Sequence, residues 1–249
     1  ADITVENGSL ATMTSSDNIT WTGTFTPTSS VEDATNVLTL ATSYTDTAGN
    51  APASTSTTDN YTVDTTAATV VAFTLSDSAL KIGDTATVTL QFSEAVTGFS
   101  SDADVTVQNG SLATMTTTDN ITWTGTFTPS SDVEDATNVM SLATSYTDTA
   151  GNAGPSATTD NYAIDTIRPT VAAFTMSDTA LISGETSTVT LQFSEAVASF
   201  SSSADITVEN GSLATMTSSD NITWTGTFTP TSSVEDATNV LTLATSYTD

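Results

Sequence analysis

The stretch ADVTVQNGSLATMT at Ala103–Thr116 decides the organisation of the chain, because it occurs three times. It reads ADITVENGSLATMT from Ala1 and again from Ala204, at spacings of 102 and 101 residues. Residues 1–46 are identical to residues 204–249. A period near 100 residues is too long for a solenoid repeat and matches one β-sandwich domain. The chain is therefore predicted to be a series of domains that each fold alone.

Two related segments mark the boundaries between these domains. YTVDTTAATV surrounds Asp64, and YAIDTIRPTV surrounds Asp165. We therefore expect three repeats: an N-terminally incomplete first repeat with strands C–G, a complete second repeat, and a C-terminally incomplete third repeat with strands A–F, at residues 1–63, 64–164 and 165–249. Because the pattern begins and stops within a repeat, we also expect the chain to be part of a longer protein.

Alternation of apolar and polar residues predicts strands in the second repeat. Seven short strands, A to G, without any helical period indicate an all-β antiparallel sandwich. Asn109-Gly110, between strands C and D, predicts a two-residue hairpin turn. The inward residues assigned to the seven strands are, in chain order, Val71, Phe73, Leu75, Val88, Leu90, Phe92, Val105, Val107, Leu112, Met115, Ile121, Trp123, Phe127, Met140, Leu142, Tyr146, Tyr162 and Ile164.

The tryptophan of strand E has two interpretations. Trp21, Trp123 and Trp224 occur once per repeat. They could form an exposed platform for sugars, or they could belong to the core. The inward period that Trp123 shares with Ile121 and Phe127 favours the core.

The amino-acid composition limits the functions that the chain can perform. The chain has 29 acidic residues, two basic residues (Lys81 and Arg168) and a net charge of −27, and it contains no cysteine or histidine. Such a charge disfavours nucleic acid, and no apolar run approaches the roughly 20 residues of a membrane-spanning helix, so we expect no direct membrane insertion. Because the chain has no histidine or cysteine, it lacks the usual catalytic bases and nucleophiles, and we expect that it is not an enzyme.

The predicted strand directions bring acidic loops together where neighbouring repeats meet. The AB loop (Asp77–Asp84) and the EF loop (Ser131–Asn138) lie at one end of the second repeat, and the BC loop (Ser93–Phe99) and the FG loop (Asp148–Asn152) lie at the other end. Carboxylates about 4 Å apart repel by roughly 1 kcal/mol in water and about 4 kcal/mol at an effective surface dielectric. Since few basic residues are available, a divalent cation with a preference for oxygen ligands, namely Ca²⁺, would neutralise such a cluster. The candidates at the second junction are Asp77, Asp84, Asp132, Glu134, Asp135, Asp165, Glu195 and Asp249.

An ordered series of motifs resembles the bacterial Ig-like repeats of large repeats-in-toxin and biofilm-associated adhesins. The motifs are FSEAVTGF, ADVTVQNGSL, TWTGTFTP, VEDATNV, DTAGN and NYAIDT. The resemblance implies tandem Ig-like sandwiches at the bacterial cell surface, outside the cell, with calcium that stiffens them. As metal ligands it favours Glu32, Asp33, Asp46, Asn50, Asp64, Glu94, Glu134, Asp135, Asp148, Asn152, Asp165, Glu195, Glu235 and Asp236.

These observations predict an extender, or stalk, of a cell-surface adhesin. Its partners would be the neighbouring repeats of the same chain, and a host or surface receptor would be bound by other domains. Two alternatives remain open. The repeats could themselves bind a polysaccharide or a partner protein, or the chain could be a subunit of a surface layer or fibre.

Overall fold

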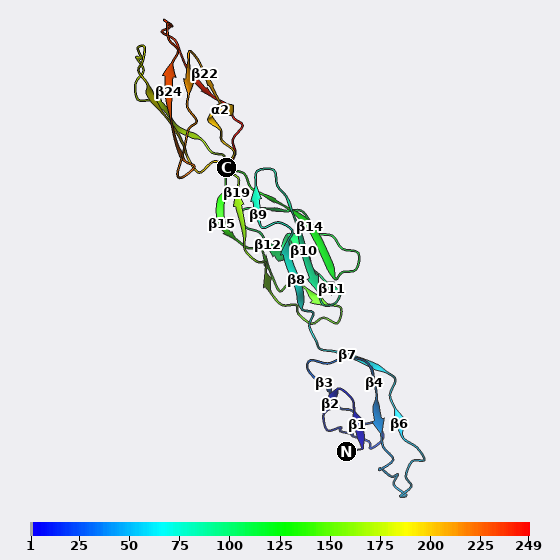
Figure 1. Ribbon diagram of the computed structural model, residues 1–249. Helices are drawn as coiled ribbons and strands as arrows, with labels where there is room; N and C mark the ends of the chain where they lie inside the picture. The colour runs from blue at the N-terminus through cyan, green and yellow to red at the C-terminus, as the bar shows by residue number, and fades with distance from the viewer. Residues whose placement is uncertain (1) are drawn as a thin grey trace. The chain divides into compact units, whose positions relative to one another are not determined.

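The computed structural model describes residues 2–249, and its regular structure is almost entirely β-strand (Figure 1). Two compact units are present, one ending at Thr166 and one starting at Ile167. The prediction of an all-β fold built from tandem Ig-like repeats is confirmed. None of the helices among residues 2–249 is long and apolar enough to cross a membrane.

The second repeat is a sandwich of two layers. One layer is a four-stranded sheet in the order β13-β14-β10-β8, and the other is formed by the three groups β12-β16-β18, β11-β17 and β15-β19-β9. The elements are β8 (Val70–Leu75), β9 (Ala79–Lys81), β10 (Ala86–Phe92), β11 (Val96–Thr97), α1 (Ser101–Asp104), β12 (Val105–Thr106), β13 (Gly110–Leu112), β14 (Thr122–Pro129), β15 (Glu134–Asn138), β16 (Ser141–Leu142), β17 (Thr147–Asp148), β18 (Ala157–Thr158) and β19 (Tyr162–Asp165).

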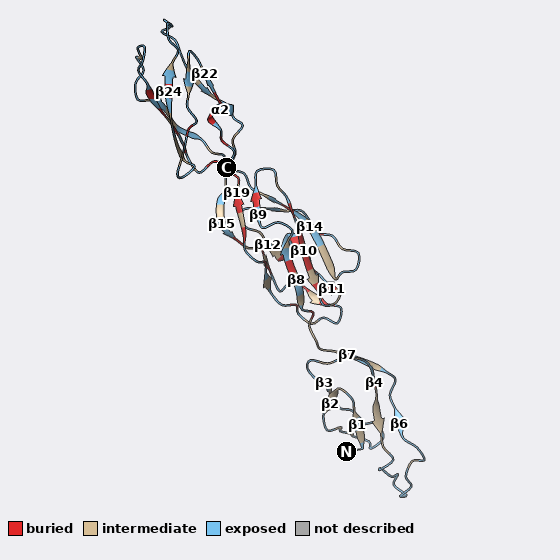
Figure 2. Ribbon diagram, in the orientation of Figure 1, coloured by how far each residue is buried: buried red, intermediate tan, exposed pale blue. Residues whose placement is uncertain are grey.

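The core of this repeat lies between the two layers, as the alternation predicts. In β10 the side chains of Val88, Leu90 and Phe92 are buried, whereas Thr87 between them is exposed. They belong to one cluster with Tyr146 of the opposite layer. Figure 2 shows this burial as red segments in β8, β9, β10 and β19. Apolar side chains on one face of each strand therefore hold the sandwich together.

The tryptophan of strand E contributes to the core in the two repeats that have a complete four-stranded sheet. Trp123 packs edge-on against Phe99 with ring centroids 4.8 Å apart, and Trp224 packs in the same way against Phe200 at 4.9 Å. In the first repeat Trp21 is 51% exposed, because residues 2–63 contain no strands equivalent to β8 and β10. The core interpretation holds where those strands are present.

The assignment of Val71 to the core is wrong. Its side chain is 61% exposed. The register between β8 and β10 shifts at a bulge, so that Ala72 lies opposite Gln91 but Val70 lies opposite Phe92. A bulge adds one unpaired residue and reverses the side-chain alternation beyond it.

The prediction of a hairpin at Asn109-Gly110 is also wrong. β12 pairs with β16 and β13 pairs with β14, so the two residues connect the two layers of the sandwich. Asn109 has the expected positive φ of 50°, but Gly110 is required for a different reason. A Cβ atom on Gly110 would lie 2.2 Å from the Phe127 ring.

Two segments predicted as loops contain strands. The expected EF loop, Ser131–Asn138, includes β15, which pairs antiparallel with β19. The expected AB loop contains β9, which pairs parallel with β19 and buries Leu80 in the core. Neither strand shows a long apolar alternation, because each pairs at the edge of a sheet over only a few residues.

The first repeat contains the later strands of the same fold. Its sheets have the orders β1-β5-β6, β2-β3 and β4-β7. Its strands are β1 (Ile3–Val5), β2 (Gly8–Leu10), β3 (Phe25–Pro27), β4 (Glu32–Asn36), β5 (Leu38–Leu40), β6 (Ser56–Thr57) and β7 (Tyr61–Asp64).

The unit that starts at Ile167 repeats the four-stranded sheet as β20-β21-β24-β23, beside the pair β22-β25. Its core includes Val189, Leu191 and Phe193, which correspond to the three buried residues of β10. Its elements are β20 (Val171–Met176), β21 (Ser187–Phe193), α2 (Ser202–Asp205), β22 (Ile206–Val208), β23 (Gly211–Leu213), β24 (Thr223–Pro230) and β25 (Leu241–Leu243).

Candidate metal site

Three carboxylates meet where the last strand of the first repeat leads into the second repeat. Asp64 ends β7, Glu94 follows β10, and Asp148 ends β17. One oxygen from each residue lies within 4.8 Å of the others. Asp148 is buried, whereas Asp64 and Glu94 are half-buried. We call these three residues the Asp64 triad.

The loop after β17 holds Asp148 in place through its backbone. Oδ1 of Asp148 accepts hydrogen bonds from the N–H groups of Ala150, Gly151 and Asn152 at 2.8–2.9 Å. Gly151 has a φ of 98°, which a residue without a side chain adopts readily. The sequence DTAGN therefore folds around its own aspartate, which is the Asp148 member of the triad.

Asn152 supplies a neutral hydrogen-bond donor between two of the acidic residues. Its Nδ2 donates to Oδ2 of Asp148 at 2.8 Å and, more weakly, to the backbone oxygen of Asp64 at 3.3 Å. An amide cannot neutralise the charge of a carboxylate, so the triad keeps its negative charge.

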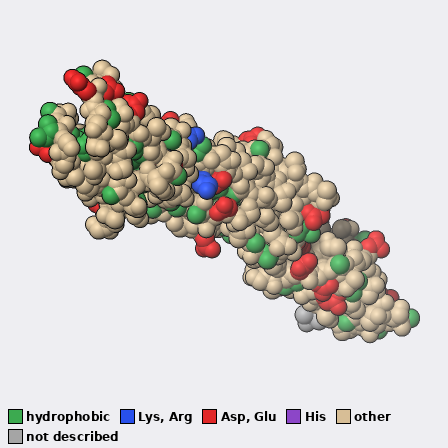
Figure 3. Space-filling view, turned by 45° about the horizontal axis from the view of Figure 1, so that its top comes forward, with side chains coloured by type: hydrophobic (Ala, Val, Ile, Leu, Met, Phe, Trp, Pro, Cys, Tyr) green, Lys and Arg blue, Asp and Glu red, His purple; other side chains and the backbone are tan. Residues whose placement is uncertain are grey.

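The electrostatics of the triad are those of crowded like charges. Loss of solvent raises the pKa of Glu94, and the charges of Asp148, Asp64 and Glu32 raise it further. For Asp148, burial also acts to raise the pKa, but the hydrogen bonds from Asn152, Gly151 and Ala150 outweigh it and lower the pKa. Every charge that acts on Glu94 is another carboxylate. The sequence contains only two basic residues, and Figure 3 shows few basic side chains on the face in view.

The donor set of the triad fits a hard divalent cation. All of its side-chain ligands are carboxylate oxygens, which Ca²⁺ prefers, and a cation would relieve the repulsion that raises the pKa of Glu94. The imidazole and thiolate ligands that favour zinc are missing from the sequence, which contains no histidine or cysteine.

Glu94→Gln should stabilise the chain when no divalent cation is present. A raised pKa in the folded state means that protonated Glu94 favours folding, and that this contribution is lost as the pH rises through the folded pKa. Glutamine resembles the protonated form. We expect the melting temperature in EDTA at pH 7 to rise by about 2–4 °C, which corresponds to about 1 kcal/mol in a chain of this size.

Calorimetry from pH 4 to 7 checks this prediction. As the pH falls and Glu94 becomes protonated, the difference in melting temperature between the wild-type chain and Glu94→Gln should disappear. Asp102→Asn, which changes an exposed carboxylate elsewhere, is the control. A lower melting temperature for Glu94→Gln in EDTA would contradict the electrostatic account.

The remaining acidic residues from the EDATN motif lie outside the triad. Glu32 stands opposite Asp64 in the β4–β7 pair, and Glu134 stands opposite Asp165 in the β15–β19 pair. The aspartate that follows each glutamate accepts a hydrogen bond from an asparagine of another loop. These contacts are Asn7 to Asp33 at 2.8 Å, Asn109 to Asp135 at 2.9 Å and Asn210 to Asp236 at 3.0 Å; Glu235 of the same motif is exposed.

Two further candidates form local turns. Asp77 accepts a hydrogen bond from the backbone of Ala79 at 3.0 Å, and Asp84 accepts one from Lys81 at 3.1 Å. Neither is part of the Asp64 triad.

The first repeat carries a copy of the aspartate loop. Oδ1 of Asp46 accepts a backbone hydrogen bond from Asn50 at 2.8 Å, and Asn50 Nδ2 donates to Asp46 Oδ2 at 3.0 Å. Both residues are exposed.

In the sequence, the three residue types of the triad recur 101 positions later, at Asp165, Glu195 and Asp249.

A polar network in the second repeat was not predicted from the sequence. Asn138 is fully buried, and its Nδ2 donates to the backbone oxygens of Asp135 and Tyr162 at 2.9 and 3.1 Å. Its Oδ1 accepts a hydrogen bond from Asn109 at 2.7 Å. The recurrence of NG and EDATN in every repeat was the available signal.

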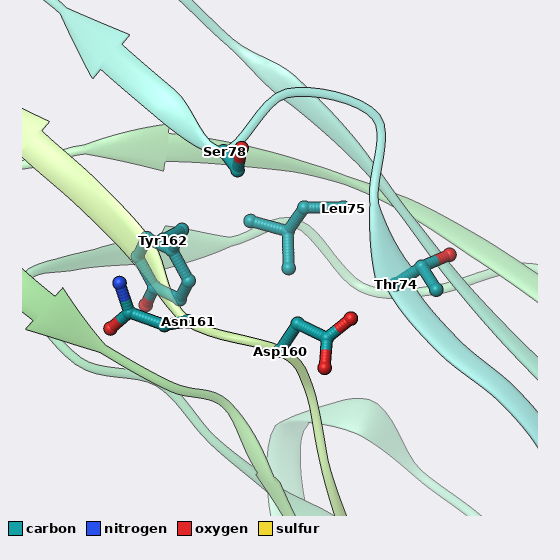
Figure 4. A pocket seen from close by; sticks show the side chains of 6 residues that line it. All are labelled: Thr74, Leu75, Ser78, Asp160, Asn161 and Tyr162. Atoms are coloured by element: carbon teal, nitrogen blue, oxygen red, sulfur yellow. The ribbon is translucent and has the colours of Figure 1, made fainter.

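A pocket of about 240 Å³ lies beside the end of β8 and the start of β19 (Figure 4). It is smaller than the roughly 300–1,000 Å³ of typical small-molecule sites. Its polar side chains include a single carboxyl group, Asp160, whereas general acid–base chemistry commonly pairs two titratable groups. The expectation that the chain is not an enzyme stays a prediction.

The three repeats match one known protein family. The family model described as a bacterial Ig-like domain matches residues 1–63, 64–164 and 165–249. A search of curated proteins gives no match.

Two solved structures are similar over most of the chain. One is FdeC, an adhesin of Escherichia coli, at 13% identity over 98% of this chain and 85% of that chain, with a TM-score of 0.35. The other contains the N-terminal eight Ig domains of the Down syndrome cell adhesion molecule, isoform 1.30.30. It has 10% identity over 96% of this chain and 31% of that chain, with a TM-score of 0.32.

Proposed function

This chain belongs to the bacterial Ig-like domain family throughout its three repeats, and we propose that it is a calcium-stiffened extender of a large bacterial cell-surface adhesin. In this role the repeats add length and carry a terminal binding domain away from the cell. A host or surface receptor is bound by other domains, in the manner of repeats-in-toxin or biofilm-associated adhesins. The acidic surface keeps neighbouring copies of similar β-domains soluble.

The observation that carries the proposal is the position of the Asp64 triad. Asp64 belongs to β7, which pairs with β4 of the first repeat. Glu94 and Asp148 belong to the second repeat. A Ca²⁺ ion held by these three residues would supply positive charge and tie the end of one repeat to two loops of the next.

The same three residue types recur in the sequence with the period of the repeats. An extender needs an equivalent device at every junction, because one loose junction would let the array fold back. In the sequence, Asp165, Glu195 and Asp249 lie 101 residues after the three residues of the Asp64 triad.

Calcium should raise the stability of the whole chain. Extracellular calcium modules can have dissociation constants near 10⁻⁴ M, and 10 mM calcium would then add about 2.7 kcal/mol per site. Thermal melts in EDTA and in calcium measure this gain, and small-angle scattering under the same conditions measures the maximum dimension of the particle. We expect a higher melting temperature and a longer, stiffer particle in calcium.

Two matched variants test whether the stabilisation by calcium arises at the Asp64 triad or from general screening of the negative charge. Asp64→Asn should reduce the calcium-dependent rise, whereas Asp102→Asn should leave it unchanged. If neither the melting temperature nor the maximum dimension responds to calcium, the calcium-stiffened extender is excluded, and reproducible glycan binding by the calcium-free chain would then favour the polysaccharide-binding alternative.

A further inference from the structure

Each repeat places an Asn-Gly pair in a cage of hydrogen bonds. In the second repeat, Nδ2 of Asn109 donates to Asp135 Oδ2 at 2.9 Å and to Asn138 Oδ1 at 2.7 Å. The backbone oxygen of Asn109 accepts a hydrogen bond from Ser130 at 2.9 Å. Beside it, Gly110 lies so close to the Phe127 ring that even a methyl group would clash. Both the side chain and the following peptide are therefore held.

We propose that Asn109, with its equivalents Asn7 and Asn210, is a deamidation site that the native fold protects and that marks a repeat which has unfolded. The proposal does not depend on calcium or on a role in adhesion. It rests on the reactivity of an Asn-Gly pair and on the contacts of the Asn109 amide.

The reaction needs only water. The backbone nitrogen of Gly110 loses its proton and attacks Cγ of Asn109, which is unhindered because glycine has no side chain. The new N–Cγ bond closes a succinimide ring, the Cγ–Nδ2 bond breaks, and Nδ2 leaves as ammonia. Water then opens the ring at either carbonyl, which yields aspartate or isoaspartate without any change in oxidation state.

The native fold opposes the first step. To cyclise, the side chain of Asn109 must leave Asp135 and Asn138, and the peptide to Gly110 must turn beside the buried Phe127 ring. These movements require opening of the β13–β14 edge or of the whole repeat. The reaction rate should then follow the population of the open state.

Deamidation would leave a lasting loss of stability, because its product cannot make the hydrogen bonds that the Asn109 amide makes. A carboxylate at position 109 has no proton to donate, yet it would face Asp135 Oδ2 and Asn138 Oδ1, which are both acceptors. Asn138 cannot turn its amide around without loss, because its Nδ2 already donates to Asp135 and Tyr162 backbone oxygens. A repeat deamidated while unfolded would therefore refold to a less stable state.

The chain also contains an internal comparison. Asn7 and Asn210 make the same two contacts, with Asn36 and Asn239 in the place of Asn138. Asn138 is fully buried, whereas Asn239 is exposed. The cage around Asn210 is therefore more open, and Asn210 should react faster than Asn109 in the folded chain.

Peptide mapping by mass spectrometry tests the proposal on the intact chain at pH 8 and 37 °C, with and without 8 M urea. Peptides from residues 1–46 and 204–249 are identical, so Asn7 and Asn210 are read as one pool and Asn109 separately. Without urea, Asn109 should react at least about 100-fold more slowly than in urea, and more slowly than the pool. In urea the two readings should agree. Equal rates for Asn109 in both conditions would overturn the protection.

A second measurement tests the mark itself. Asn109→Asp should lower the melting temperature of the chain, and the loss should shrink at low pH, where a protonated carboxyl group can donate again. Asn120→Asp, at an exposed asparagine with a similar positive φ of 57°, is the control and should melt like the wild-type chain. If Asn109→Asp melts like Asn120→Asp, deamidation does not mark the repeat.

Discussion

Asn138→Ala should lower the free energy of unfolding of the second repeat by about 3–4 kcal/mol, since a buried polar group left without a partner costs about 1–3 kcal/mol. Asn138 is fully buried and satisfies three groups from three segments. These are the backbone oxygens of Asp135 and Tyr162 and the side-chain amide of Asn109. Alanine leaves both oxygens without this donor and adds a cavity.

Hydrogen exchange and urea denaturation measure this loss. Peptides that cover β15 and β19 should lose protection first, because Asn138 bridges these strands where their register shifts between Asp135 and Asn138. Asn161→Ala is the matched control. Its Nδ2 donates to the Ala136 oxygen at 2.9 Å, but the residue is exposed, so its loss should cost less than about 1 kcal/mol. Equal effects of the two variants would show that the buried network is not important for stability.

The same residues explain why β15 was predicted as a loop. The sequence EDATN has no apolar alternation, so a pattern-based reading finds no strand there. In the structure, Asn138 and Asp135 connect this segment to β19 and to Asn109, which lie 24 and 29 residues from Asn138 in the sequence. Polar contacts between distant segments leave no periodic signal.

The core was predictable because its signal is local. The two longest strands of the four-stranded sheet, β10 and β14, alternate over enough residues to identify their buried faces, as Val88, Leu90 and Phe92 illustrate. The same rule failed at Val71, because a bulge depends on the neighbouring strand. It also failed at Asn109-Gly110, because the turn signal is the same whether the next strand returns to its neighbour or crosses to the other layer.

The candidate site was predictable in part for a different reason. Alternating strand directions place the linker, the BC loop and the FG loop at one end of the sandwich, and the structure brings Asp64, Glu94 and Asp148 together there. Strand direction cannot tell which carboxylates already have local partners. Asp135 accepts hydrogen bonds from the backbone N–H and the side chain of Thr137 and from Asn109, and these hydrogen bonds lower the pKa of Asp135.

Tyr146 connects the core of the second repeat to the Asp64 triad, and its removal should have an effect as large as that of Asn138. The side chain is fully buried, its ring lies 5.0 Å from that of Phe92, and its hydroxyl donates to the Pro155 oxygen at 2.7 Å. Asp148 follows two residues later. Tyr146→Ala should cost about 3–5 kcal/mol, the usual range for removal of a buried aromatic ring.

Tyr146→Phe distinguishes the contribution of the buried ring to stability from that of the hydroxyl group. Phenylalanine keeps the packing and loses one hydrogen bond, so it should cost about 1 kcal/mol. Calcium titration of both variants then tests the connection to the site. If the core holds Asp148 in position, Tyr146→Ala should weaken calcium binding and Tyr146→Phe should retain it. Wild-type affinity in a folded Tyr146→Ala chain would show that the FG loop positions Asp148 without the core.

The hydroxyl of Tyr146 also predicts an alkaline transition. Burial, with a smaller contribution from Asp104, raises its pKa from 10.0 to about 12. A raised folded-state pKa means that the stabilising contribution is fully present below pH 10 and is lost as the pH rises towards 12. The wild-type chain should therefore lose stability across this range, and Tyr146→Phe should lose less. Urea midpoints measured from pH 9 to 12 test this, and parallel curves for the two proteins would mean that ionisation of Tyr146 does not contribute to alkaline unfolding.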